Sequence, residues 1–213
     1  MTVSKKAFWA ITVILIILLA DQIVKIWVKT NFVLGEDYQI TSWFHIRFIE
    51  NDGMAMGIKV IGKLFLSIFR IIASFAIAYY VYLLIRNNFN LSYIILVSMI
   101  FAGAAGNIID SVFYGVIFSE STYSQVAILF PQGGGYGSWL HGEVVDMFYF
   151  PLFKFIWPSW IPLVGGSEFE FFRYIFNVAD ASISVGIVTL LLFFRKTLSL
   201  SFEKQEVEKE VRN

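Results

Sequence analysis

Four long apolar runs, separated by polar segments, dominate the pattern of hydrophobic and polar positions. They cover residues 7–28, 64–85, 91–109 and 174–194. A helix needs roughly 20 residues to cross a hydrocarbon core about 30 Å thick, and each run is long enough. The pattern therefore predicts an all-α membrane protein with four transmembrane helices, folded as a single membrane domain over residues 1–213.

The basic residues that flank these runs predict their orientation. They stand before the first run, between the second and third, and after the fourth, at Lys5, Lys6, Arg86, Arg195 and Lys196. Short cytoplasmic flanks carry an excess of Lys and Arg. Both termini are therefore expected in the cytoplasm, with residues 30–63 and 114–173 on the outer side of the membrane.

The two outer segments differ in composition. Residues 30–63 mix β-branched and aromatic side chains, which predicts a small β-rich segment. Residues 114–173 contain a glycine-rich stretch at 132–137 and an aromatic run from Phe148 to Trp160 that is too interrupted to span a membrane. Because aromatic side chains favour the membrane–water boundary, we expect this run to form an interfacial loop or helix region.

Composition narrows the class of protein further. Apolar residues make up 58% of the chain and charged residues 15%, against roughly 45–50% and about 25% in soluble domains. Sixteen Lys and Arg balance sixteen Asp and Glu, so no basic field is available to bind nucleic acid. With no Cys and two His, neither a thiolate site nor a zinc site is expected, and no metal or cofactor is predicted.

Four acidic residues fall in apolar surroundings at what should be one level of the membrane. Asp21 and Asp180 lie about 22 Å, and Asp110 about 28 Å, along their helices from the cytoplasmic ends. Asp146 follows in an apolar stretch of the second outer segment. Charged groups inside a membrane are costly and usually functional. The alternative is that these acids cap helix ends or pair with nearby basic residues.

Two neighbouring carboxylates in a poorly solvated pocket can share one proton and act as an acid–base pair. The ionised carboxylate deprotonates a water while the protonated one polarises a carbonyl, as in aspartic proteases. Such a site needs no metal, thiol or histidine. The chain contains neither a His-Glu-x-x-His nor a Gly-x-Ser-x-Gly motif, whereas a Ser–Lys dyad stays open.

Five short blocks follow one another along the chain in the order of a known family. They are Asp21-Gln22-x-x-Lys25, Asn51-Asp52-Gly53-Met54-Ala55-Met56-Gly57, Gly103-Ala104-Ala105-Gly106-Asn107-Ile108-Ile109-Asp110, Val144-Val145-Asp146-Met147-Phe148 and Phe176-Asn177-Val178-Ala179-Asp180. These blocks resemble the signature blocks of lipoprotein signal peptidase, the type II signal peptidase of bacteria. One block alone would be weak, but five in sequence across the four-span core are specific.

The resemblance implies an aspartic endopeptidase of the bacterial inner membrane that works without a cofactor. Its substrates would be diacylglyceryl-modified prolipoproteins, from which it would remove the signal peptide by cleaving before the lipidated cysteine. It would contact membrane lipid, bind no nucleic acid, act as a monomer and carry its active site near the outer face of the membrane.

The resemblance also implies roles for the matched residues. Asp146 and Asp180 match the catalytic pair of the family. Asn107 and Asp110 match polar supports beside the active site, and Asn177 lies one helical turn before Asp180, on its face.

Two further pairs of residues belong to the matched blocks. Asn51 and Gly53 fall in the outer segment that clasps the substrate in this family. Asp21 and Lys25, at positions i and i+4 of the first helix, can form a structural ion pair.

The chain departs from the family pattern in three places. Ser111 stands where an Arg is usual, so a contact normally made by that Arg is in doubt, and Met56 stands where Phe is usual. The stretch between Gly115 and Glu143 is longer than in the family, which blurs the spacing to Asp146. Glu143 is therefore a rival to Asp146 for the catalytic position, although the Val-Val-Asp-Met-Phe block favours Asp146.

Some alternatives remain open at this point. Residues 132–137 form either a lid over the site or a slack connector, since glycine permits both. The rival functions are an ion- or proton-coupled transporter that uses the buried acids as a relay, and a non-enzymatic membrane assembly factor. A transporter is disfavoured because the acids lie at one level instead of along a path, and no symmetric pair of broken helices is evident.

Overall fold

The structure is a computed structural model. It describes residues 1–51 and 63–210, and residues 204–210 are described by their backbone alone. The chain forms two compact units. Unit 1 comprises Met1–Gln22, Ile61–Ile109 and Val178–Asn213, and unit 2 comprises Ile23–Val60 and Asp110–Asn177. The expected single membrane domain stays a prediction.

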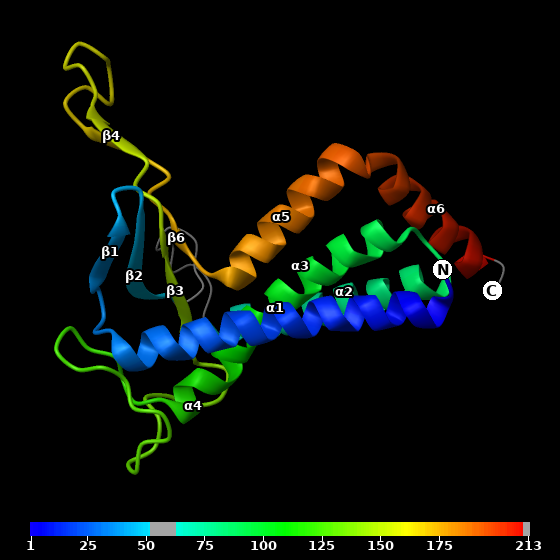
Figure 1. The fold of residues 1–213 in the computed structure, drawn as a ribbon, viewed down its shortest axis with the longest axis horizontal. Coiled ribbons are helices and arrows are strands. Elements are labelled where there is room, and N and C mark those ends of the chain that lie inside the picture. The colour runs from blue at the N-terminus through cyan, green and yellow to red at the C-terminus, as the bar shows by residue number, and fades with distance from the viewer. Residues whose placement is uncertain (52–62, 211–213) are drawn as a thin grey trace. The chain divides into compact units, whose positions relative to one another are not determined.

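Unit 1 is built from helices (Figure 1). They are the first part of α1 (Val3–Asn31), α2 (Lys63–Arg86), α3 (Leu91–Ile109), α5 (Val178–Phe193) and α6 (Arg195–Glu210). Helix α3 packs against both α2 and α5. A cluster of buried apolar side chains holds these helices together, at Ala10, Val81, Leu84, Tyr93, Ile94, Leu96, Val97 and Leu190.

Small residues let α3 and α5 approach closely. A methyl group added at Gly103 would lie 2.3 Å from the backbone oxygen of Ala179, and one at Gly186 would lie 2.6 Å from the side chain of Ile100. Glycine is therefore required at position 103, where the close atom is backbone, whereas a methyl group at position 186 would force the Ile100 side chain to shift. Small residues at such contacts are usual where membrane helices pack closely.

Three helices in the described part of the chain are long and apolar enough to cross a membrane. They are Val3–Asn31, Lys63–Arg86 and Leu91–Ile117, and a fourth candidate is the pair Val178–Phe193 and Arg195–Glu203, which bends by 90°. By length and composition there are thus three candidate spans, or four if the bent pair is one span. The first three apolar runs of the sequence coincide with α1, α2 and α3.

The fourth run begins as a strand, not as a helix. Strand β6 (Ile175–Phe176) pairs with β3, placing Phe176 opposite Phe148, and α5 starts only at Val178. The predicted span over residues 174–194 is therefore too long at its start. Its first residues form β-sheet hydrogen bonds instead of helical ones.

Unit 2 contains an antiparallel sheet of four strands in the order β1-β2-β3-β6. Strands β1 (Asp37–Thr41) and β2 (Phe44–Asn51) come from the first outer segment, as predicted. Strand β3 (Val144–Tyr149) comes from the second. The chain is therefore not strictly all-α, and its β-rich part is larger than the sequence indicated.

The aromatic run of the second outer segment also contains a strand, β4 (Phe153–Ile156). It pairs with β5 (Glu168–Phe171), which lies beyond the run, as an antiparallel hairpin. The prediction of a loop or helix over this run is wrong, because its residues form strands. The position of the run at the membrane interface stays a prediction. Aromatic and other residues alternate along both strands, and this period of two is the signal of a strand.

At the end of α3 the helix widens into a π-helical turn, η2 (Asp110–Tyr114), followed by the short α4 (Gly115–Ile117). Such turns are rare and frequently lie at functional sites. The long segment that follows runs back to β3 mostly without regular secondary structure, tied by a bridge between Phe118 and Leu129.

Candidate active site

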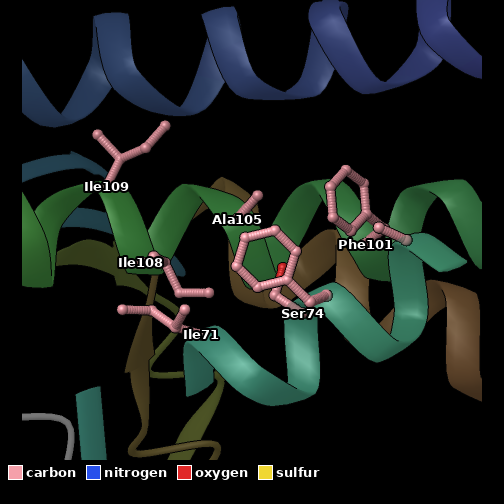
Figure 2. A pocket seen from close by; sticks show the side chains of 8 residues that line it. Ile71, Ser74, Phe101, Ala105, Ile108 and Ile109 are labelled. Carbon is pink, nitrogen blue, oxygen red and sulfur yellow. The ribbon is translucent and has the colours of Figure 1, made fainter. Parts of the chain in front are cut away.

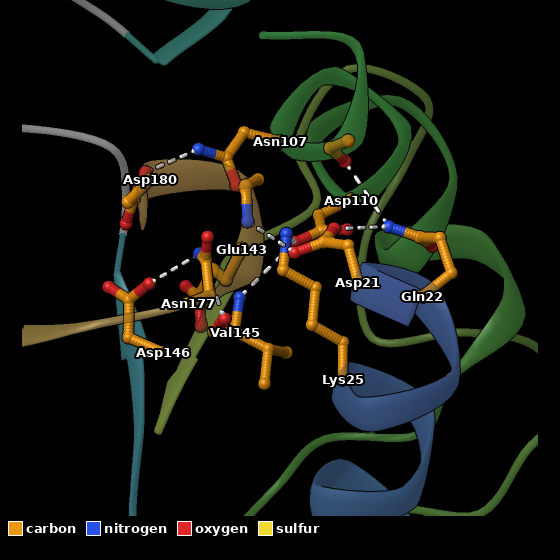
Figure 3. A network of polar contacts seen from close by, with 12 residues as sticks. Asp21, Gln22, Lys25, Asn107, Asp110, Glu143, Val145, Asp146, Asn177 and Asp180 are labelled. Atoms are coloured by element: carbon orange, nitrogen blue, oxygen red, sulfur yellow. Dashed lines mark hydrogen bonds and ion pairs between the residues drawn. The ribbon is translucent and has the colours of Figure 1, made fainter. Parts of the chain in front are cut away.

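In unit 2, Asp146 lies on the buried strand β3, with 3% of its surface exposed. The side-chain amide of Asn177 donates to Asp146 Oδ1 at 2.7 Å and to the backbone oxygen of Val145 at 3.2 Å (Figure 3). The amide of Asn51, at the end of β2, donates to Asp146 Oδ2 at 3.3 Å. Both carboxylate oxygens of this buried acid therefore have hydrogen-bond donors, as burial requires.

A buried ion pair supports the strand that carries Asp146. Lys25 Nζ lies 2.8 Å from Asp110 Oδ2, and both side chains are fully buried. The same Asp110 oxygen accepts a long hydrogen bond, 3.4 Å, from the backbone N–H of Val145. Burying two charges costs several kcal/mol per ion unless the pair has good geometry and further hydrogen bonds. The pair thus links α1 and η2 to the backbone next to Asp146.

In unit 1, Asp180 lies in the first turn of α5 and is half-buried. The side-chain amide of Asn107 on α3 donates to Asp180 Oδ1 at 2.7 Å (Figure 3). The first turn of a helix is a favourable place for an anion, because the helix dipole is positive there.

Asp21 of α1 holds the beginning of the same helix. Its Oδ1 accepts the backbone N–H of Ala179 at 2.8 Å, one of the amides that a helix leaves without an internal partner. The amide of Gln22 donates to Asp21 Oδ2 at 3.1 Å and to the backbone oxygen of Gly106 at 3.3 Å. Asp21 therefore anchors α5 to α1 just before Asp180.

The structure thus brings the predicted site residues together in two groups, one in each unit. Unit 2 gathers Asn51, Asp110, Asp146 and Asn177 with Lys25, and unit 1 gathers Asp21, Asn107 and Asp180. The pairing of Asp21 with Lys25 stays a prediction. Gly53 and Met56 lie outside the described residues.

The structure adds detail at two positions where the chain departs from the family pattern. Ser111 is buried in η2, and its backbone oxygen accepts the N–H of Gly142 at 2.9 Å. Glu143 directly precedes β3, and its backbone N–H donates to the hydroxyl of Tyr136 at 2.7 Å.

Unit 2 contains a second buried charged group, which the sequence did not reveal. Lys29 is fully buried; it forms an ion pair with Glu50 and donates to Ser121 Oγ at 2.8 Å. Its ammonium also lies 5.3 Å from the ring centre of Phe118 and 5.0 Å from that of Tyr136. We call these five residues the Lys29 cluster. Lys29 follows Lys25 by four residues on α1, and this spacing was the available signal.

The Lys29 cluster fastens the long segment between Gly115 and Glu143 to α1 and β2. Burial raises the pKa of the Tyr136 phenol well above its usual range, so this hydroxyl stays neutral and can accept a hydrogen bond. Backbone hydrogen bonds from Tyr136 to Phe118 and from Gly137 to Gly115 tie the end of the glycine-rich stretch. The lid expected over residues 132–137 stays a prediction.

Unit 1 also contains an apolar pocket of about 380 Å³ between α2 and α3. Figure 2 shows the side chains that line it, from Ile71, Ser74, Phe75, Ala78, Phe101, Ala105, Ile108 and Ile109. Ser74 contributes the one side-chain hydroxyl in this lining. Asn107 stands between the lining residues Ala105 and Ile108, so the same stretch of α3 serves both the pocket and Asp180.

Long apolar helices with carboxylates and amides gathered at their ends define a multi-pass membrane protein with a polar site. A family model described as signal peptidase (SPase) II matches residues 13–196. The chain therefore belongs to the signal peptidase II family, whose members are aspartic peptidases, and the resemblance seen in its sequence blocks is confirmed.

Individual relatives agree with the family match. The lipoprotein signal peptidase of Porphyromonas gingivalis (strain ATCC 33277) is 52% identical over 188 residues, which cover 88% of this chain and 83% of that protein. The lipoprotein signal peptidase of Amoebophilus asiaticus (strain 5a2) is 32% identical over 210 residues, covering 95% and 84%. The peptidase interpretation is thus favoured over the transporter and the assembly factor.

A solved structure shares the fold. It is a bacterial membrane enzyme determined by the in meso method at 2.3 Å resolution, and it matches with a TM-score of 0.60 and 24% sequence identity over 89% of both chains. The apolar helices and the family match support a multi-pass protein of a bacterial membrane.

Proposed function

We propose that Asp146 and Asp180 are the catalytic pair of this peptidase and that it cleaves diacylglyceryl-modified prolipoproteins before the lipidated cysteine. The observation that carries this assignment is the position of Asn177. Its amide donates to Asp146 at 2.7 Å, and Asp180 follows it by three residues. Three residues span at most about 11 Å, so the covalent chain permits both carboxylates to act on one substrate bond.

The hydrogen bonds suggest how the two acids divide the reaction. Asp146 accepts amide N–H groups at both oxygens, which suits an ionised carboxylate, because that group can only accept. Asp180 accepts the amide of Asn107 in the first turn of α5, where an anion is also favoured. The two acids therefore act as a coupled pair: one, ionised, takes a proton from the attacking water, and the other, protonated, donates to the oxygen of the scissile carbonyl as the water oxygen bonds to the carbonyl carbon.

Collapse of the tetrahedral intermediate completes the cleavage. The carbon–nitrogen bond breaks, and the leaving amine of the lipidated cysteine takes up a proton from the acid pair. The signal peptide leaves with a new carboxyl group. Asn107 and Asn177 hold the two carboxylates in place, and the Lys25–Asp110 ion pair holds the backbone beside Asp146.

The apolar pocket between α2 and α3 is suited to one acyl chain of the substrate. Its volume of about 380 Å³ falls within the range of roughly 300–1,000 Å³ usual for ligand pockets. Its lining offers almost only hydrocarbon and aromatic surface, and each buried methylene group contributes about 0.8 kcal/mol. Asn51 and Gly53 are assigned to the substrate clasp on the family resemblance alone.

The assigned topology follows the flanking charges. Four spans would place both termini in the cytoplasm and the acid pair near the outer face of the inner membrane, in a monomer that forms one membrane domain. The Lys6 ammonium donates to the backbone oxygen of Asn88 at 3.0 Å. Lys6 therefore caps the turn between α2 and α3 at the end assigned to the cytoplasm.

Cleavage of a diacylated precursor peptide by the full-length protein in vesicles tests the assignment. Asp146→Asn and Asp180→Asn should each lower the turnover number by at least about 100-fold, the usual size of a lost acid–base group. The matched control is Asp37→Asn, which changes an exposed acid on β1 that pairs with His45. Near-normal turnover in either site variant, or a loss confined to Glu143→Gln, would refute the pair.

A further inference from the structure

Strands β4 and β5 form a hairpin with two chemically different faces. We call residues 153–171, which include the connecting turn, the aromatic hairpin. Phe153 pairs with Phe171, and Phe155 pairs with Phe169. Directly paired residues project from the same face of a sheet, so these four rings form one phenylalanine face. The rings of Phe153 and Phe171 stack at 4.8 Å, and those of Phe155 and Phe169 lie 4.9 Å apart.

The opposite face of the hairpin, called the polar face below, carries Lys154, Glu168 and Glu170 together with Ile156, and it contacts the larger sheet. Lys154 pairs with Glu170 across the two strands, and their charged groups lie 3.0 Å apart. The hydroxyl of the buried Tyr149 on β3 also donates to Glu170. Because the polar face makes these contacts, the hairpin is oriented with respect to β3, and its phenylalanine face points away from them.

The phenylalanine face and the tip of the hairpin are exposed. Phe153 keeps 52% of its surface accessible, Trp160 at the tip 79%, and Leu163 beside it is fully exposed. A two-stranded hairpin is marginally stable in water on its own. Exposed apolar patches of this kind mark sites where another protein or a membrane binds.

The aromatic surface continues from the hairpin to β6. Phe171 contacts Phe172, and Phe172 contacts Phe150 at 6.4 Å between ring centres. Phe150 stacks in turn on Phe176 of β6 at 5.7 Å. Contacts between aromatic rings therefore continue from the hairpin to Phe176, two residues before Val178, where α5 begins.

We propose that the phenylalanine face and the tip of the aromatic hairpin insert into the lipid leaflet in which α5 begins. The end of β5 lies seven residues before Val178, which the chain can bridge over at most about 25 Å, so the bilayer is within reach. A face made only of Phe side chains forms no hydrogen bonds, whereas an interface between two proteins contains about one hydrogen bond per 100–200 Å² of interface area. Lipid acyl chains need none, and aromatic side chains are enriched at membrane surfaces.

The absence of cysteine from the sequence allows a direct test in the full-length protein. Single thiols at Phe155→Cys and Leu163→Cys, labelled with an environment-sensitive fluorophore, report on the phenylalanine face and the tip. Lys154→Cys is the matched control, one residue away on the same strand but on the polar face. The labelled proteins are reconstituted in phosphatidylcholine–phosphatidylglycerol vesicles with and without brominated acyl chains.

Insertion predicts blue-shifted emission at positions 155 and 163 and several-fold stronger quenching by brominated lipid there than at position 154. Equal quenching at all three positions would overturn the proposal. A blue shift that grows with the protein-to-lipid ratio, without bromine quenching, would assign the face to a second copy of the chain instead. Trp160→Phe gives a label-free check: it should remove part of the native fluorescence that brominated lipid quenches, and no change would count against insertion.

Discussion

Replacing Lys29 by methionine tests whether the Lys29 cluster holds unit 2 together. The substitution keeps a long unbranched side chain and removes the ammonium group. The side chain of Glu50 is 6% exposed, and its partner Lys29 is fully buried. In the variant the carboxylate of Glu50 keeps Ser121 as a donor but loses its compensating charge.

The size of the effect follows from this geometry. Removing one partner of a buried ion pair costs about 3–5 kcal/mol, because an uncompensated charge stays behind. The ammonium also lies near the rings of Phe118 and Tyr136, and a desolvated cation–π contact contributes up to about 2 kcal/mol. We therefore expect Lys29→Met to lower the free energy of unfolding by about 3–5 kcal/mol.

Denaturant unfolding in detergent micelles measures this loss, and a double-mutant cycle isolates the pair. Glu50→Gln combined with Lys29→Met removes both charges and should be less destabilising than the sum of the single changes. Lys154→Met is the control, because its pair with Glu170 is partly exposed and contributes below about 1 kcal/mol. A loss under about 0.5 kcal/mol for Lys29→Met, or strictly additive changes, would refute the reasoning.

Two further predictions concern the close packing of helices in unit 1 and the buried phenol in unit 2. Gly103→Ala places a methyl group 2.3 Å from the backbone oxygen of Ala179 and should lower the free energy of unfolding by about 1–3 kcal/mol. Gly133→Ala is the control, because the space around that residue is open, and it should change the free energy little. Equal effects of the two substitutions would contradict the argument. Burial raises the pKa of Tyr136, so the unfolded chain loses this proton at lower pH than the folded chain does, and stability falls as the pH rises above about 10. Tyr136→Phe should weaken this alkaline loss in unfolding measured as a function of pH, and an unchanged pH dependence would contradict the assigned cause.

The sequence predicted those features that depend on neighbouring residues. The apolar runs over residues 7–28, 64–85 and 91–109 appear as α1, α2 and α3, because hydropathy over about 20 residues is a local property. The first outer segment forms strands for the same reason, since β-branched and aromatic residues recur within it. The alternation of Phe with other residues in 153–156 and 168–171 carried the same signal for β4 and β5, but the length of the aromatic run obscured it.

The sequence named the candidate site residues but not their contacts. Sequence blocks named Asp146, Asp180 and their Asn neighbours, yet nothing local showed that Asn177 bonds to Asp146, 31 residues earlier in the chain. Likewise, nothing local showed that Asp21 accepts the backbone N–H of Ala179 in α5, 158 residues away.

Residue types and their periodicity therefore established the membrane class, the first three helices and the list of candidate acids. Folding alone settled the rest: β6 in place of the first turn of the fourth helix, the burial of Lys29 against Glu50, and the amide donors of each carboxylate. The physical reason is that hydropathy and strand alternation act between near neighbours along the chain. Sheet pairing and buried ion pairs join residues that only the folded chain brings together, and their energy depends on the burial that the fold creates.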